Sequence, residues 1–288
     1  MVRHYKMKGH KKRKRDKVQY DKEENGEEEY VEKSVPGEGG AEEEEDEENI
    51  NEKKRRAEEI ANELPSLPIV LADDQKNANK PGVIFILEKA SLEVAKVGKN
   101  YQLLNSDKHA NFLRRNGRNP ADYRPDIAHQ AILMILDSTL NKSGRMKALY
   151  VKTEKGVLFE IKPHVRIPRT FDRFSGIMLQ LLQKLSITAV GKREKLLQAI
   201  QNPVTKYLPI NSRKIGFSHS SQKLVDMQDY VAAVGNEMNL VFVVGAMAHG
   251  KIDVDYVEDF ISISDYPLSA AFCISRICNA VERNWRVL

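Results

Sequence analysis

The chain has 288 residues, a formal net charge of +5 at pH 7 and 41% hydrophobic residues. That apolar content is enough for a sizeable core, in one large domain or two small ones, and it excludes a wholly disordered protein. The sequence has no apolar run of about twenty residues and no secretory leader, so we expect no membrane partner.

Charge is distributed very unevenly along the chain. Residues 1–20 carry nine Lys/Arg and one Asp, whereas residues 21–50 carry two Lys and fifteen acids. Residues 61–288 keep 31 of the 46 Lys/Arg and 22 of the 41 acids, a net charge of +9. A basic body suits a polyanionic partner, although a surplus of this size is also common on soluble domains.

Residues 1–62 are predicted to form a disordered tail, basic and then acidic, because they lack the apolar residues that a core needs. The run Lys11–Arg15 is interpreted as a nuclear or nucleolar signal, with a nonspecific basic arm as the alternative. The acidic block Glu42–Glu48 is interpreted as a solvated tail; the alternatives are that it competes with RNA for the basic body or docks other basic proteins. A single domain is expected from residue 63 to residue 288.

The first half of this domain opens with a buried strand at 83–87. Helices are expected at 92–98 and 107–116, the second started by Ser106. A third, strongly apolar helix is expected at 127–136, with Asp126 as its N-cap. His129 on this helix is interpreted as a core residue.

A hairpin follows at 146–152 and 157–161, then an amphipathic helix at 170–185. The remaining elements before the C-terminal region are a helix at 192–201, a strand at 214–218 and a helix at 224–234. Strands that alternate with helices predict an α/β fold with a mostly parallel sheet flanked by helices.

The last fifty residues contain two strands that each end in a loop suited to ligand binding. An apolar run at 240–244 stops at Gly245 and leads to Gly250, and a strand at 260–263 leads into the loop 264–268. Ser269 then caps a helix that carries Cys273 and Cys278, two thiols expected to be buried and reduced. Ligands of open α/β sheets bind at such strand ends, but the usual dinucleotide and phosphate-loop motifs are missing.

Four segments resemble one family of RNA-modifying enzymes. They are V-G-A-M-A-H-G-K (Val244–Lys251), I-S-D-Y-P-L-S-A (Ile263–Ala270), R-P-D-I-A-H-Q (Arg124–Gln130) and V-R-I-P-R-T-F-D-R-F-S-G (Val165–Gly176). The chain from about Gly82 onward is similar to the SPOUT-class Nep1/Emg1 methyltransferases, which methylate N1 of a pseudouridine in small-subunit ribosomal RNA. The resemblance implies a deep C-terminal trefoil knot, a homodimer, partners among pre-ribosomal assembly factors, and a place in the nucleus or nucleolus.

The resemblance also implies that S-adenosylmethionine is the cofactor and that no metal is needed. The family's cofactor contacts correspond to positions in both C-terminal loops and at the end of the preceding strand. These positions are Phe217, Gly245, Gly250, Ile263, Ser264, Asp265, Tyr266, Pro267 and Leu268. Asp265 stands where relatives often carry Asn.

Arg166, Arg169 and Arg173 are spaced along an extended segment and the first turn of a helix, which by spacing alone indicates a solvated face. The resemblance implies instead that they bind the RNA substrate together with Arg124. It also implies that Asp126 orients Arg124, so Asp126 has two possible roles, helix cap and arginine holder.

The sequence assigns no catalytic base. Asp126 and Asp265 are candidates, but we prefer to interpret them as a helix cap and a loop acid, and His249 is interpreted as orienting backbone. The first hypothesis for function is therefore a pseudouridine N1-methyltransferase of small-subunit ribosomal RNA. The alternative is an RNA-binding ribosome assembly factor with little or no catalysis.

Overall fold

The structure is a computed structural model, and it describes residues 80–189, 194–235 and 237–287. All of them belong to one compact unit of the chain. The predicted tail at 1–62, its basic run and the expected start of the domain at residue 63 lie outside the described residues. No helix in the described part of the chain combines the length and the apolar character that a membrane crossing needs.

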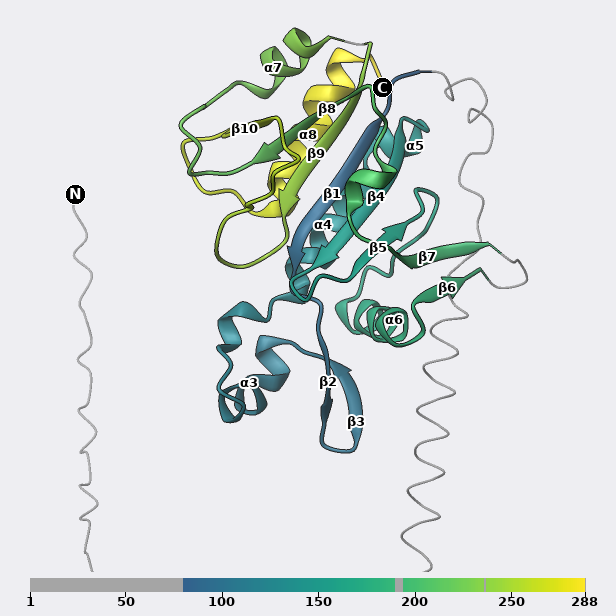
Figure 1. Cartoon of the computed structure of the whole chain (residues 1–288), viewed down its shortest axis with the longest axis vertical. Coiled ribbons are helices and arrows are strands. Elements are labelled where there is room, and N and C mark those ends of the chain that lie inside the picture. The colour runs from purple at the N-terminus through teal and green to yellow at the C-terminus, as the bar shows by residue number, and fades with distance from the viewer. Residues whose placement is uncertain (1–79, 190–193, 236, 288) are drawn as a thin grey trace, which may run out of the picture. The chain divides into compact units, whose positions relative to one another are not determined.

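An eight-stranded sheet organises this unit, in the strand order β10-β8-β9-β1-β4-β5-β7-β6 (Figure 1). The five strands from β10 to β4 are parallel to their neighbours, and the last three pair antiparallel. The strands are β1 (Val83–Ala90), β4 (Met146–Thr153), β5 (Leu158–Ile161), β6 (Ser186–Thr188), β7 (Lys195–Ile200), β8 (Ser212–Phe217), β9 (Asn239–Gly245) and β10 (Asp259–Ile261). The prediction of an α/β fold with a mostly parallel sheet is confirmed.

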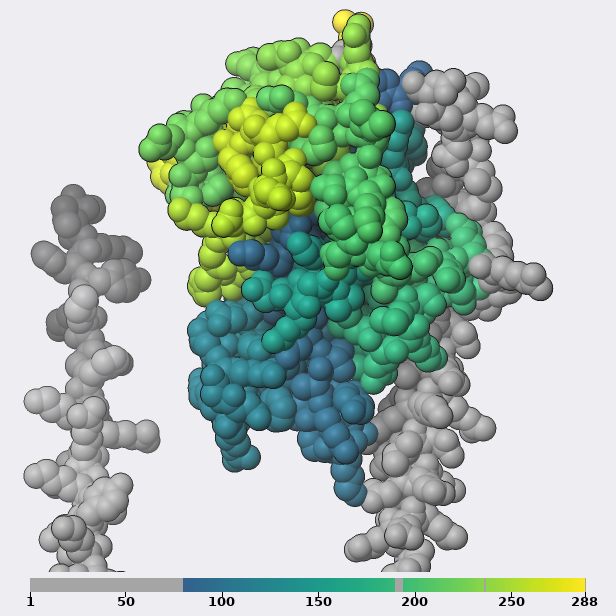
Figure 2. Space-filling view, in the orientation of Figure 1, coloured from purple at the N-terminus to yellow at the C-terminus, as the bar shows by residue number. Residues whose placement is uncertain are grey.

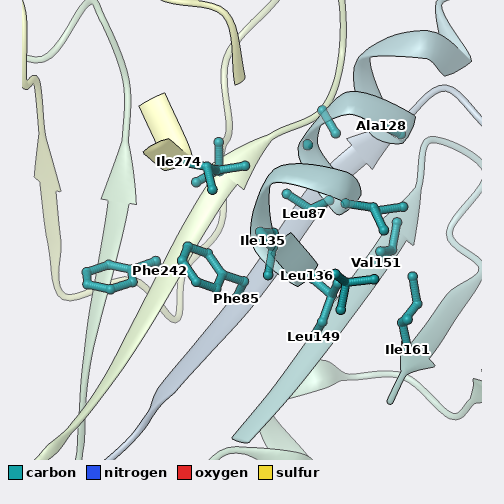
Figure 3. Close-up of a cluster of buried hydrophobic side chains, with 14 of the residues drawn as sticks. Phe85, Leu87, Ala128, Ile135, Leu136, Leu149, Val151, Ile161, Phe242 and Ile274 are labelled. Atoms are coloured by element: carbon teal, nitrogen blue, oxygen red, sulfur yellow. The ribbon is translucent and has the colours of Figure 1, made fainter. Parts of the chain in front are cut away.

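The central strands β1 and β9 are buried on both faces, which explains why their sequences are nearly continuous apolar runs. Phe85 of β1 lies beside Phe242 of β9, with ring centroids 5.5 Å apart. Figure 3 shows these two rings beneath Ile274, with Leu87 and Leu149 continuing the same apolar layer along the sheet.

Helices cover the face of the sheet to which Phe85 points. These are α4 (Pro125–Asp137), α5 (Thr139–Lys142), α6 (Phe171–Lys184), α7 (Met227–Val234) and α8 (Ala270–Asn284). The opposite face carries Ile86 and Val243, which pack with Val204 of the short helix η2 (Val204–Tyr207) and with Ile252 in the loop after β9. That loop is therefore part of the packed fold.

Within this unit, a smaller substructure follows the end of β1. It contains the hairpin β2 (Val94–Val97) and β3 (Asn100–Leu103), then α3 (Ser106–Arg115) and η1 (Pro120–Asp122). The N-cap of α3 is Asn105, whose side chain accepts from the N–H groups of Asp107 and Lys108, and not the expected Ser106.

Two predicted helices are wrong. The segment expected as a helix at 92–98 forms strand β2, because the turn through Gly98 returns the chain and pairs it with β3. The described part of the helix expected at 192–201 is strand β7, which pairs with β5 on one side and β6 on the other. Its sequence K-L-L-Q-A-I favours a helix locally, and pairing on both edges overrides that preference.

Both cysteines are buried and free, as expected. Burial raises the pKa of Cys273 and of Cys278 to about 12. These thiols therefore stay protonated and unreactive near neutral pH.

Candidate functional site

A pocket of about 380 Å³ lies where β8, β9 and β10 end, beside the start of α8; we call it the C-terminal pocket. Its position at the carboxyl ends of neighbouring parallel strands is where open α/β sheets bind ligands. The lining comes mainly from the segments 217–219, 244–252 and 261–270, with Ile127 of α4 and Cys273 of α8.

The loop after β9 forms one wall of this pocket. Its first residue is anchored, because the N–H of Ala246 donates to the carbonyl of Glu88 at 2.8 Å. Gly250 has a φ of +102°, a backbone conformation that residues with a side chain rarely adopt, so a substitution at this position would be strained. A Cβ on Gly245 would lie 2.7 Å from the Sδ atom of Met247, so a side chain there would push the Met247 thioether aside.

The loop after β10 forms another wall of the pocket, and its own serines hold its shape. Ser262 Oγ donates to the carbonyl of Ser264 at 2.9 Å, and Ser264 Oγ accepts from the N–H of Tyr266 at 3.1 Å. Ser269 caps α8 by accepting from the N–H of Phe272 at 3.2 Å, as its sequence position predicts. The loop therefore keeps its shape through bonds that do not need a ligand.

The pocket wall is apolar where Phe217 and Ile263 contribute, and both side chains are buried. Tyr266 is 77% exposed, so it stands at the mouth and not in the interior. An apolar slot bordered by loop backbone suits a flat ring whose edge needs hydrogen bonds.

Eight of the nine predicted cofactor residues line this pocket: Phe217, Gly245, Gly250, Ile263, Ser264, Tyr266, Pro267 and Leu268. Asp265 is exposed and does not line it. Sequence reasoning missed further lining residues, among them Ile127, His219, Met247 and Lys251. Met247 and Lys251 lie within the quoted motifs and could have been found there, whereas Ile127 reaches the pocket only through the fold.

Arg124 and Asp126 form a two-point ion pair at the start of α4. Arg124 Nε and Nη2 lie 2.9 Å and 2.7 Å from the two carboxylate oxygens of Asp126. The guanidinium of Arg124 lowers the pKa of Asp126, chiefly through this hydrogen bond. The interpretation of Asp126 as the N-cap is wrong, because Arg124 occupies the cap position and Asp126 lies in the first turn.

We call residues 165–173 the basic segment; it contacts α4 at His129 and at Asp137 and leads into the first turn of α6. Val165 and Ile167 are buried, while the alternating Arg166 and also Arg169 and Arg173 are exposed. Arg169 pairs with Asp137 at 2.9 Å, in a contact that is itself largely exposed. The buried side chains of Val165 and Ile167 therefore anchor the basic segment, and its three arginines face solvent.

His129 joins α4 to the basic segment. Its Nε2 lies 2.7 Å from the carbonyl of Pro168, and its ring stacks on Phe174 with centroids 4.3 Å apart. Burial lowers the pKa of His129. The interpretation of His129 as a core residue is confirmed.

The comparisons with known proteins agree on one family. A family model described as "EMG1/NEP1 methyltransferase" matches residues 85–282. The mouse and human proteins named "Ribosomal RNA small subunit methyltransferase NEP1" are each 49% identical over 206 residues, which cover 72% of this chain and 83% of theirs. The Caenorhabditis elegans protein of that name is 45% identical over 215 residues, covering 75% of this chain and 92% of its own.

A structural likeness accompanies these matches. The crystal structure of Archaeoglobus fulgidus Nep1 bound to S-adenosylhomocysteine superimposes with a TM-score of 0.53, covering 71% of this chain and 99% of that one. The two sequences are 20% identical, so this match shows a shared fold.

Proposed function

The chain belongs to the EMG1/NEP1 methyltransferase family, and from this premise we propose that it transfers a methyl group from S-adenosylmethionine to N1 of a pseudouridine in small-subunit ribosomal RNA. Relatives in mouse, human and C. elegans are named for the methylation of that RNA. The observation that carries the proposal is the C-terminal pocket, whose two walls are the motif-bearing loops after β9 and β10.

The residues of the C-terminal pocket fit S-adenosylmethionine. Phe217, Ile263 and Leu268 offer apolar surface to an adenine ring, and the glycines at 245 and 250 leave backbone accessible to its edge and to the ribose. When bound, the cofactor supplies a methyl group already activated on a sulfonium. The protein then needs to hold the acceptor nitrogen in line and to exclude water, and we propose no metal for this chemistry.

For the RNA we propose binding by Arg124 and by the three arginines of the basic segment. All four are exposed, and planar guanidinium groups suit both phosphates and stacked bases. Asp126 holds the Arg124 guanidinium in a fixed direction before RNA arrives, which lowers the entropy lost on binding.

We also propose that the C-terminal segment forms a trefoil knot. The support is the return of the C-terminal segment onto earlier chain, where Ser262, just after β10, forms a parallel bridge with Leu224. The Ser262 N–H donates to the carbonyl of Lys223 at 2.8 Å, and its carbonyl accepts from the N–H of Val225 at 2.9 Å. The chain then continues into α8, which packs against α4 and α7.

A homodimer, assembly-factor partners and a nuclear or nucleolar location complete the proposal. The exposed aromatic side chains of Tyr266 and Phe272, 77% and 54% accessible, support a protein contact near the C-terminal pocket. For the location, replacing the basic run Lys11–Arg15 with alanines should move a fluorescently tagged chain out of the nucleus. Unchanged nuclear fluorescence would contradict that role.

Methyl-labelled S-adenosylmethionine tests the central proposal. The protein should transfer label to an RNA loop that contains pseudouridine and not to the same loop with uridine, which lacks the N1–H. Binding of both RNAs without transfer to either would contradict the enzyme and favour the assembly-factor alternative.

A further inference from the structure

The end of β1 carries a buried acid for which the proposed chemistry has no use. The Glu88 side chain is only 3% exposed. Strand alternation places it on the same face of the sheet as Ile84 and Ile86, in a layer of mainly apolar residues. A carboxylate is costly to bury unless it has partners. The partners of Glu88 therefore indicate what this residue does.

The closest partner of Glu88 is a hydroxyl from the loop after β9. Tyr256 donates to Glu88 Oε1 at 2.7 Å, and Lys152 Nζ of β4 lies 3.7 Å from Glu88 Oε2. The loop runs from residue 246 to residue 258, a described stretch without helix or strand. Burial, and after it the Glu88 carboxylate, raises the pKa of the Tyr256 hydroxyl, which therefore remains a donor at neutral pH. The bond thus ties an irregular loop to the central strand.

The backbone of β1 is irregular at this point. Its pairing with β4 shifts register between Leu87 and Ala90, and Lys89 has a φ of +55°, in the left-handed region that lysine rarely adopts. In a regular strand, consecutive side chains point to opposite faces. Here Lys89 Nζ donates to the carbonyl of Lys251 at 2.8 Å, so Glu88 and Lys89 both contact the loop after β9. Bulges beside functional sites re-aim side chains in this way.

The contacts with the end of β1 are spread along the loop, at Ala246, Lys251 and Tyr256. Between the first and the last of them lie residues that line the C-terminal pocket, from Met247 to Ile252. The buried side chain of Ile252 keeps the loop against the sheet, and the directional bonds fix where along the sheet it lies. In Figure 2 the yellow-green surface of the C-terminal loops meets the dark blue end of β1.

We propose that Glu88 is a positioning residue of the cofactor site, which through Tyr256 holds the loop after β9 where it can contact S-adenosylmethionine. This inference rests on the proposed function. Neither Glu88 nor Tyr256 lines the C-terminal pocket, so both act through the loop. Without their bond the loop occupies its binding position for only part of the time, and the apparent affinity for the cofactor falls by that fraction.

Tyr256→Phe tests the bond, because it removes the hydroxyl and keeps the ring that packs against the sheet. Calorimetry well below the melting temperature should give a Kd for S-adenosylhomocysteine about tenfold above the parental value, as expected for a hydrogen bond to a charged group. In methyl transfer, the KM for S-adenosylmethionine should rise by the same factor while kcat stays within about twofold. Global destabilisation alone would change neither quantity in a protein that remains folded.

The matched control is Tyr230→Phe on α7. It removes a hydroxyl that donates to the carboxylate of Asp259, also at 2.7 Å. The Kd for S-adenosylhomocysteine should stay parental in this variant, because the loop after β9 keeps its bond to Glu88.

Two further variants separate positioning from stability. Glu88→Gln keeps an acceptor for the Tyr256 hydroxyl, so its Kd for S-adenosylhomocysteine should lie within about threefold of the parental value. Glu88→Leu combined with Tyr256→Phe replaces both partners by apolar groups, and Lys152, 34% exposed, can turn to water. The double variant should therefore regain much of the Tm lost in Tyr256→Phe. Its Kd should stay about tenfold raised, since apolar contact restores no directional bond.

The outcomes distinguish this inference from the proposed function. Parental affinity in Tyr256→Phe, equal weakening in Tyr230→Phe, or an affinity that recovers together with Tm in the double variant would each overturn the positioning role of Glu88. A parent protein that binds S-adenosylhomocysteine but transfers no methyl group would contradict the proposed reaction alone. A parent protein that does not bind S-adenosylhomocysteine would overturn both.

Discussion

Replacing Asp126 by Asn separates the folding role of this residue from its effect on RNA binding. The substitution removes the charge that holds Arg124 by two hydrogen bonds but keeps the size of the side chain. The Arg124 and Asp126 side chains are 45% and 31% exposed, so the ion pair contributes only about 0.2–1 kcal/mol. The charge of Asp126 also interacts favourably with the N-terminus of α4, and this interaction contributes a similar amount. Loss of both should lower the free energy of unfolding by about 1 kcal/mol.

That loss corresponds to a Tm lower by about 2–4 °C for a domain of this size. Because Asp126 is not the N-cap, the free energies of unfolding of Asp126→Ala and Asp126→Asn should agree within a few tenths of a kcal/mol. If Asp126 were the cap, the Ala variant would be less stable than the Asn variant by about 1 kcal/mol. Since the lowered pKa of Asp126 makes its contribution complete above a pH of about 4, melting at pH 7 measures it in full.

RNA binding should suffer in both variants. Arg124 regains its rotamer freedom, and immobilising it again costs about 0.5–1.5 kcal/mol, so the Kd for the target loop should rise about two- to tenfold. Fluorescence anisotropy at fixed salt measures this change. Asp229→Asn is the control, since it removes the same charge from the first turn of α7. Parental RNA affinity in Asp126→Asn would refute the arginine-holding role.

Three further perturbations test the pocket, the RNA surface and the pH response. Gly250→Ala places a Cβ at a φ of +102° and should weaken calorimetric S-adenosylhomocysteine binding about tenfold, whereas Gly176→Ala inside α6 should not; equal affinities would move the site. Replacing the three arginines of the basic segment with Ala should lower the salt slope of RNA binding by about 0.7 per lost phosphate contact, and an unchanged slope would leave them a solvated face. Burial lowers the pKa of His129, so stability should be complete above a pH of about 6.5 and fall below it. His129→Phe, which keeps the stack on Phe174, should flatten this decline in melts between about pH 8 and 5, and an equally steep decline would exclude His129 as its cause.

The sequence predicts the parallel half of the fold well. Strands β1 and β9 are long β-branched runs bounded by glycine or charge, and both faces of each are buried, so their sequences are unambiguous. The two predicted helices that are strands lie in the antiparallel edge and in the β2–β3 hairpin. There, partners distant in space or a tight turn decide the conformation, and local propensity says little.

Some residues of the candidate site could likewise be predicted from the sequence and others could not. Motif residues such as Gly245 and Tyr266 could be identified because the loops after β9 and β10 are continuous in sequence. The cavity that Lys89, Asp122, Lys155 and Ala248 help to line could not be predicted from the sequence. It combines residues near positions 90, 120, 155 and 248, which only the sheet order brings together. The Arg124–Asp126 contact was predicted, but its place in the helix was not, since Pro125 starts α4 two residues earlier than the apolar pattern indicates.

Strand β1 also constrains how the chain can be made. Its two neighbours in the sheet, β4 and β9, are completed only at residues 153 and 245. During synthesis, this buried central strand therefore keeps one open edge until nearly the whole protein has left the ribosome. An unpaired edge of this kind is a template for aggregation. A chain truncated before residue 245 should consequently aggregate and be degraded. It should not persist as a shortened protein with partial function.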